Sequence, residues 1–366
     1  MFRQELYKLL IKKHILLLFV LFILLYGVFN MISPQPPDFT DKAQQETYKS
    51  YMQQLTGPLT AEKEDFILSE QEKYSRSAKR VEQITNDYAA GKINDVEYDT
   101  LIEKESTYMV NEPVFKQIQR QYNYIKEDVE HRFFMDYTGW NSLMGKEAIN
   151  YILLFFILIS TTIVFSCEYD SGMFVINSTC KYGKKRTILN KIIIGLLIAV
   201  FGSLLFATMD IISISVQTPL IHGNYPIQSL PFFSNYLGEL SLIKSYSIVV
   251  LLNIFGCCYA STLIMCLSVI SKSTMTTLFV NLAINIVPYI LSISSRVKYL
   301  LPLPGGLLAG TGYFIGPVKD VDSGKTIFPA ISSFELISLI LTILIIMIIS
   351  IIIMFRFYVP KRKVMK

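Results

Sequence analysis

Long apolar runs separated by polar segments divide this chain. A membrane-spanning helix needs about 20 mostly apolar residues, because the hydrocarbon layer is about 30 Å thick. Four runs meet this requirement clearly, and two weaker runs contain Asp210 and the trio Asn281, Asn285 and Pro288. The six predicted spans are residues 14–32, 148–166, 191–214, 246–271, 275–294 and 334–355. The pattern predicts an all-α membrane protein with six transmembrane helices.

The first run follows a basic start, so it could be read as a cleaved signal peptide. Its apolar core is longer than that of a usual signal peptide, and no small-x-small cleavage site precedes Ser33 and Pro34. We therefore interpret residues 1–33 as a cytoplasmic N-terminus followed by a retained first span.

Lysine and arginine in the short loops indicate the orientation. With the N-terminus inside, the predicted cytoplasmic segments hold 15 basic residues and the short external loops hold 5. This predicts a multi-pass protein of the cell membrane with both termini in the cytoplasm. The long segment 34–146 then lies outside with a net charge of −6, while the rest of the chain carries +11. The basic surplus suits anionic membrane lipid and cytoplasmic partners, and does not indicate nucleic acid.

The polar segment 34–146 predicts an extracellular helical hairpin or small bundle. A helix over 60–90 would begin at Thr60 and stop at Gly91, and Asn94 with an acid three residues later resembles a capping box for a second helix. Pro113 is expected to start or kink a third helix. Two apolar stripes recur at helical spacing. The first is Ile67, Tyr74, Val81 and Tyr88, and the second is Ile118, Tyr122, Ile125 and Val129. They form either the core of this bundle or a surface for a substrate, a second copy or an external partner.

Composition argues against an ordinary water-soluble enzyme, since 52% of the residues are hydrophobic, 17% are charged and the mean hydropathy is +0.41. The five cysteines lie in or beside apolar runs and the three histidines are scattered, so we expect no metal site. We identify no catalytic residues. Residues 323–326 read Ser-Gly-Lys-Thr, but Lys319 stands where a phosphate-binding loop needs its first glycine. Any ATP hydrolysis would have to come from another polypeptide.

Residues 165–191 carry the most informative motif. A span ends, Glu168 appears, Gly172 follows four residues later, and a short amphipathic stretch leads to a basic turn before Lys191 opens the next span. Met173 and Phe174 could enter the membrane surface while the basic residues meet lipid phosphate or a partner. The pattern predicts a short helix on the inner face of the membrane.

This motif resembles that of the permease subunits of ABC type-2 exporters. The six-span plan, the external insertion after the first span and the Pro/Gly-rich residues 301–306 before the last span are also similar to that family. The resemblance covers most of residues 148–356 and does not explain segment 34–146 in detail. It implies a transmembrane domain over 147–366 with spans 2–6 and a re-entrant segment near 300–316.

The resemblance further implies a coupling helix near 168–180 that docks on a separate cytoplasmic ABC ATPase subunit. That subunit would hold ATP and Mg, and this chain would hold no cofactor. A second permease copy, identical or related, would complete an exporter for a hydrophobic or amphipathic substrate such as an antibiotic, a peptide or a lipid-like compound. The implied coupling residues are Glu168, Asp170, Gly172, Met173, Phe174, Lys184, Lys185 and Arg186. The plainer alternative makes Glu168 an ordinary interface acid and the basic residues only the orientation signal.

Three polar residues inside the spans are candidates for a transport path: Asp210, Asn281 and Asn285. Ionisable groups within a membrane are costly and are usually functional, although Asp210 could also lie at the interface. Two other functions stay open. One is a secondary transporter, for which repeated halves and midplane charges would be expected. The other is a membrane sensor or scaffold with the external bundle as its receptor.

Overall fold

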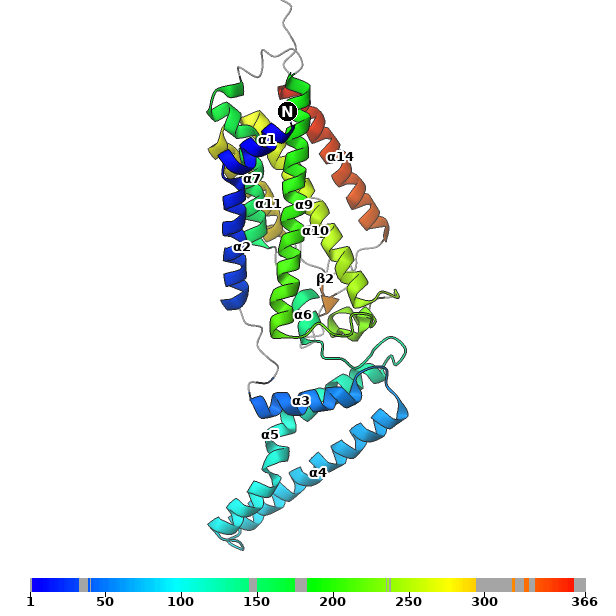
Figure 1. The fold of residues 1–366 in the computed structure, drawn as a ribbon. Helices are drawn as coiled ribbons and strands as arrows, with labels where there is room; N and C mark the ends of the chain where they lie inside the picture. Colours follow the sequence, from blue (N-terminus) through cyan, green and yellow to red (C-terminus); the bar gives the residue numbers. More distant parts are fainter. Residues whose placement is uncertain are drawn as a thin grey trace, which may run out of the picture.

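A computed structural model gives the structure of the chain. It describes residues 2–32, 39, 41–144, 150–174, 183–234, 236, 238–293, 318–319, 326–328 and 333–358. Helices dominate these residues and fall into two groups, a bundle of long apolar helices and a smaller polar bundle beyond one of its ends (Figure 1). The predicted re-entrant segment 300–316 lies outside the described residues.

Among the described residues, four helices are long and apolar enough to cross a membrane. They are α7 (Tyr151–Asp170), α9 (Gly183–Gln217), α10 (Leu242–Ser271) and α14 (Ser333–Tyr358). A fifth is added if the N-terminal helices α1 (Phe2–Tyr7) and η1 (Lys8–Lys12) count as one bent span with α2 (Ile15–Ile32), from which they turn by 52°. These lengths and compositions are those of an all-α, multi-pass membrane protein.

The six-span prediction is supported only in part. Helix α11 (Thr274–Ile293) coincides with the fifth predicted run, but it is not among the described helices that meet the length and hydropathy criteria for a span. A short antiparallel pair, β1 (Val318–Lys319) and β2 (Thr326–Phe328), precedes α14. The sixth crossing therefore stays a prediction.

Helix α10 packs against α7, α9, α11 and α14, so it lies at the centre of the apolar bundle. Small residues allow the helices to approach closely, as is typical of membrane proteins. Ser261 of α10 donates a hydrogen bond to the backbone oxygen of Gly195 on α9 at 3.1 Å. Within α7, the hydroxyls of Ser160 and Thr161 donate hydrogen bonds to backbone carbonyls one turn earlier, so these buried groups are satisfied inside the helix.

Gly202 of α9 lies at a second place where two helices approach closely, and a substitution there is a testable prediction. A methyl group there would lie 2.9 Å from the ring of Phe156, which itself packs on Phe19 with the ring centres 5.2 Å apart. We expect Gly202→Ala to destabilise the protein by about 1–3 kcal/mol through overpacking. At Gly27 the nearest atom would be the Met209 methyl at 3.5 Å, an ordinary contact, so Gly27→Ala is the matched control. Unfolding in mixed micelles measures both, and equal stability of the two variants would contradict the prediction.

The polar bundle between α2 and α7 contains α3 (Lys42–Leu55), α4 (Ala61–Ala89) and α5 (Asp95–Lys126). Helices α4 and α5 form a long hairpin, and α3 packs on α5 near its base (Figure 1). The capping box at Asn94 is confirmed, and Gly91 lies just past the end of α4 with a φ of +69°. Thr60 is at the start of α4, but its side chain makes no capping hydrogen bond.

The prediction at Pro113 was wrong in part, because α5 runs through it as one helix of 32 residues and no third helix begins there. Buried residues on either side, such as Asn111 before it and Val114 after it, hold the helix together across the missing hydrogen bond. Val129 is 41% exposed, since α5 ends before it. Near that end the Tyr122 hydroxyl and then the Lys126 ammonium donate to Glu64, which lowers the pKa of this carboxyl.

A junction layer joins the polar bundle to the apolar helices. It consists of α6 (Thr138–Met144) and the short helices η2 (Ile227–Ser229) and η3 (Pro231–Phe233) from the loop between α9 and α10. The Trp140 indole donates to the Ile221 carbonyl at 2.8 Å, and the Tyr124 hydroxyl of α5 donates to the Gln228 carbonyl at 2.7 Å. The bundle is therefore anchored directly on the membrane domain. The N-terminal helices and the end of α14 lie at the opposite end of the molecule (Figure 1).

Candidate functional site

Four elements distant in sequence meet at one carboxylate at the end of the apolar bundle that is opposite the polar bundle. Glu168 comes from the last turn of α7, Lys8 from η1, Lys191 from α9 and Tyr358 from the end of α14. Lys8 is 160 residues from Glu168 in the sequence, and Tyr358 is 190 residues from it. We refer to these four side chains as the ionic centre.

The Glu168 carboxylate accepts hydrogen bonds on both oxygens. Lys8 donates to Oε1 at 3.0 Å, whereas Lys191 and the Tyr358 hydroxyl lie 2.9 and 2.6 Å from Oε2. The side chains of Glu168 and Lys191 are both 0% exposed, and Lys8 is partly buried. The arrangement ties the N-terminal helix and the end of the last helix to the same carboxylate, the first through Oε1 and the second through Oε2.

Aromatic rings and a backbone oxygen complete the surroundings of Lys191. Its ammonium lies 5.0 Å from the centre of the Phe165 ring and donates to the Val164 carbonyl at 2.9 Å. A cation over an aromatic face is attracted to the electrons of the ring. The ammonium is therefore satisfied on several sides although no part of it reaches solvent.

A buried ion pair persists only where good geometry and further hydrogen bonds offset the desolvation of both charges. The ionic centre meets this condition, because the carboxylate has three donors and Lys191 has two acceptors. Lys8 also lies 3.6 Å from the Glu5 carboxylate, so two cations face two anions. This balance keeps charge in the interior without leaving one group unpaired.

The turn after α7 contains the first predicted coupling residues. Asp170 is exposed and accepts a hydrogen bond from Thr274, the first residue of α11. Gly172 has a φ of +68°, a conformation that favours glycine, and an added Cβ would meet no atom of the described residues within 4 Å. Met173 is 41% exposed, so it is available for an outside contact.

Phe174 connects this turn to the ionic centre. Its ring lies 5.2 Å from that of Tyr358, edge to face, and 4.7 Å from that of Tyr169. The other predicted coupling residues are at the start of α9, where Lys185 and Arg186 are exposed and the Lys184 side chain is outside the described residues. Residues 175–182 also lie outside them. Of the range 168–180 predicted as a coupling helix, residues 168–170 belong to α7 and only 171–174 follow within the described residues, so the coupling helix stays a prediction.

The structure places Glu168 differently from the other predicted coupling residues. It belongs to α7 and is fully buried, so its side chain cannot reach a docking partner in this conformation. Tyr358 connects it to the turn, because Tyr358 touches both Glu168 and Phe174. The structure thus separates an exposed surface at 170–173 from a buried centre behind it.

The three candidate transport-path residues do not cluster with the ionic centre. Asp210 lies roughly 28 Å along α9 from Lys191, at the helical rise of about 1.5 Å per residue. Its carboxylate accepts a hydrogen bond from the Tyr26 hydroxyl of α2. Asn281 and Asn285 are fully buried on α11, and each amide nitrogen donates to the carbonyl one turn earlier, at 2.8 and 2.7 Å. Within the described residues, neither amide oxygen has a hydrogen-bond partner.

Sequence reasoning missed three of the four members of the ionic centre as site residues. Lys191 carried a signal, since it is a charge at the head of a long apolar run. Lys8 and Tyr358 carried none, because a basic N-terminal segment and a tyrosine at a span end are ordinary features of membrane proteins. Among the described residues, no group of three or more histidine, cysteine or acidic side chains is placed to hold a metal ion.

Comparisons with known proteins found no relatives of this chain. No family model matches the chain, and no curated protein or solved structure matches it either.

Proposed function

We propose that this chain is the permease subunit of an ABC exporter, moving a hydrophobic or amphipathic substrate out of the cell with energy from a separate ATPase subunit. The observation that carries the proposal is the contact of Phe174 with Tyr358, which joins an exposed turn to the ionic centre. A push on that turn would reach α7, α9, α14 and the N-terminal helix together, since all four meet at Glu168. A motor on the cytoplasmic side needs such a point of transmission.

The path for the substrate would lie between two copies of the permease. The buried amides of Asn281 and Asn285 offer two oxygens on α11 that have no hydrogen-bond partner among the described residues, the kind of polar group that a membrane helix retains for contact with a substrate or a partner helix. The outer faces of α2 and α14 are lined with exposed leucine and isoleucine, as suits contact with lipid. The charge pattern orients the turn toward the cytoplasm.

Site-specific crosslinking tests the proposal in the cells that make the protein. A photoreactive amino acid at Met173 should form an adduct with a cassette ATPase, identified by mass spectrometry of the crosslinked band. The matched control is the same label at Val96, which is 75% exposed on the far side of the molecule in α5. An adduct to the ATPase from both positions, or from neither, would contradict the proposal.

A further inference from the structure

The N-terminal helices α1 and η1 form an amphipathic stretch that turns by 52° away from α2. One side packs on the apolar bundle through Leu9, which is 0% exposed, and its neighbours Leu6 and Leu10. The other side is open and carries Arg3, Gln4 and Tyr7. A helix of this kind, which precedes a span at an angle, suits the boundary between membrane and water.

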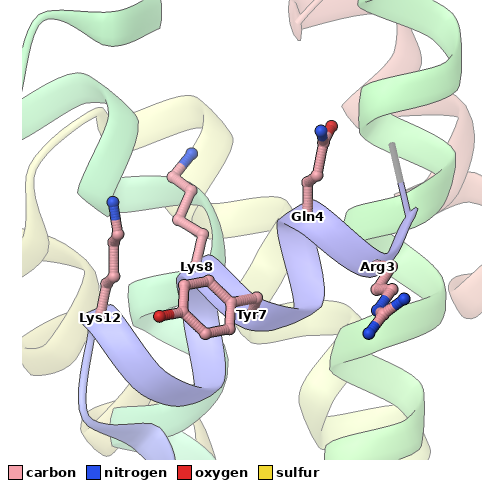
Figure 2. Close-up of a pocket in the computed structure, with 5 residues that line it drawn as sticks. All are labelled: Arg3, Gln4, Tyr7, Lys8 and Lys12. Atoms are coloured by element: carbon pink, nitrogen blue, oxygen red, sulfur yellow. The ribbon is translucent and has the colours of Figure 1, made fainter.

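A pocket of about 440 Å³ lies against this open side, lined by Arg3, Gln4, Tyr7, Lys8 and Lys12 (Figure 2). Figure 2 shows Gln4, Lys8 and Lys12 extending to the same side of the helix. Three of the five lining residues are cations, Gln4 offers an amide donor, and none is an acid. The pocket therefore combines a mostly apolar surface with donors and positive charge on its lining residues.

The positive charge of the pocket is only partly neutralised. Lys8 is paired with Glu168 and lies near Glu5. In the part of the chain that the structure describes, neither Arg3 nor Lys12 forms an ion pair. Lys12 and Arg3 therefore leave an excess of positive charge beside the pocket, which favours an anionic phosphate group.

Apolar side chains beside these cations indicate where the phosphate comes from. Tyr7 is 56% exposed and Ile11 is 46% exposed on the same stretch, and Leu16 and Leu17 are exposed in the first turn of α2. Exposed apolar groups next to lysine and arginine are the pattern of a helix embedded among lipid headgroups. A soluble phosphate compound would not need them.

We infer that this pocket binds the phosphate of an anionic lipid headgroup, held by Lys12 and the Gln4 amide with Lys8 behind them, whereas the Arg3 side chain extends to the other side of the helix and adds positive charge nearby (Figure 2). The Lys8 ammonium would then face the lipid phosphate on one side and Glu168 on the other. The lipid thus becomes a neighbour of the ionic centre. This inference depends on the membrane location of the N-terminal helix and is independent of the proposed export function.

Lipid titration of the purified full-length chain in detergent, followed by native mass spectrometry, tests the inference. Phosphatidylglycerol is the probe and phosphatidylcholine the neutral comparison. We expect Lys12→Gln to weaken phosphatidylglycerol binding about fivefold, and Arg3→Gln with Lys12→Gln to weaken it further by a similar factor, since each basic residue contributes separately at an anionic surface. Phosphatidylcholine binding should not change.

Lys13→Gln is the matched control, because Lys13 is the next residue, is exposed and does not line the pocket. It should bind phosphatidylglycerol as the native chain does. An equal loss of phosphatidylglycerol binding in Lys12→Gln and Lys13→Gln would show that the lipid is attracted to the whole basic surface, and would contradict a specific site in the pocket. Displacement of the lipid by millimolar inorganic phosphate would show that the pocket binds a soluble anion, and would contradict the inference that its ligand is a lipid.

Discussion

Replacing Glu168 by leucine is expected to lower the free energy of unfolding by about 3–5 kcal/mol, because it leaves the Lys191 ammonium buried without its counter-ion. Lys191 is 0% exposed and cannot turn toward water without breaking the packing of α9 against α7. Its remaining acceptor would be the Val164 carbonyl, which does not neutralise a full charge. Reversible unfolding of the purified chain in mixed micelles with increasing sodium dodecyl sulfate measures the loss.

Two further variants decide whether the loss comes from the uncompensated charge. Glu168→Leu combined with Lys191→Met removes both buried charges, so it should regain most of the lost stability. Asp170→Leu makes the same kind of change two residues later at an exposed position and should alter stability by only about 0.5 kcal/mol. If Glu168→Leu were as stable as Asp170→Leu, the ionic centre would not hold the four elements together.

In the proposed complex of this chain with an ATPase subunit, Gly172→Pro is expected to reduce substrate-stimulated ATP hydrolysis about tenfold, within the range that coupling between two sites usually spans. Proline fixes φ near −65°, whereas Gly172 has a φ of +68°. The change also removes the hydrogen bond from the Gly172 amide to the Tyr169 carbonyl at 3.2 Å. Both effects displace Met173 and Phe174, the residues proposed to receive and transmit the motion of the ATPase.

Gly172→Asn separates the conformation of the turn from the loss of glycine itself. Asparagine accepts a positive φ more readily than other side chains, and the site has room for it. We expect hydrolysis close to native in Gly172→Asn, and normal membrane insertion and unfolding in both variants because Gly172 is exposed. Native rates of stimulated hydrolysis in Gly172→Pro would remove the turn from the transmission route.

The apolar runs located the long helices well, since all six predicted segments coincide with helices in the structure. Each run is long and continuous, and the backbone of such a segment satisfies its hydrogen bonds internally, so local sequence is sufficient. The capping box at Asn94 was predictable for the same reason, because its partners lie three residues apart. Helix α3 was not predicted, since its apolar positions are few and form a recognisable buried face only where α3 packs on α5.

The sequence by itself determined that this chain is built of long apolar helices with a polar helical segment after the first, and that the turn after residue 168 combines an acid, a glycine and a basic stretch. The tertiary structure alone decided that Glu168 is buried and which groups surround it. Its partners Lys8 and Tyr358 are 160 and 190 residues away, and no local pattern can encode a contact between positions so far apart. Packing of four separate elements brings those charges together, because each is stable in the interior only beside the others.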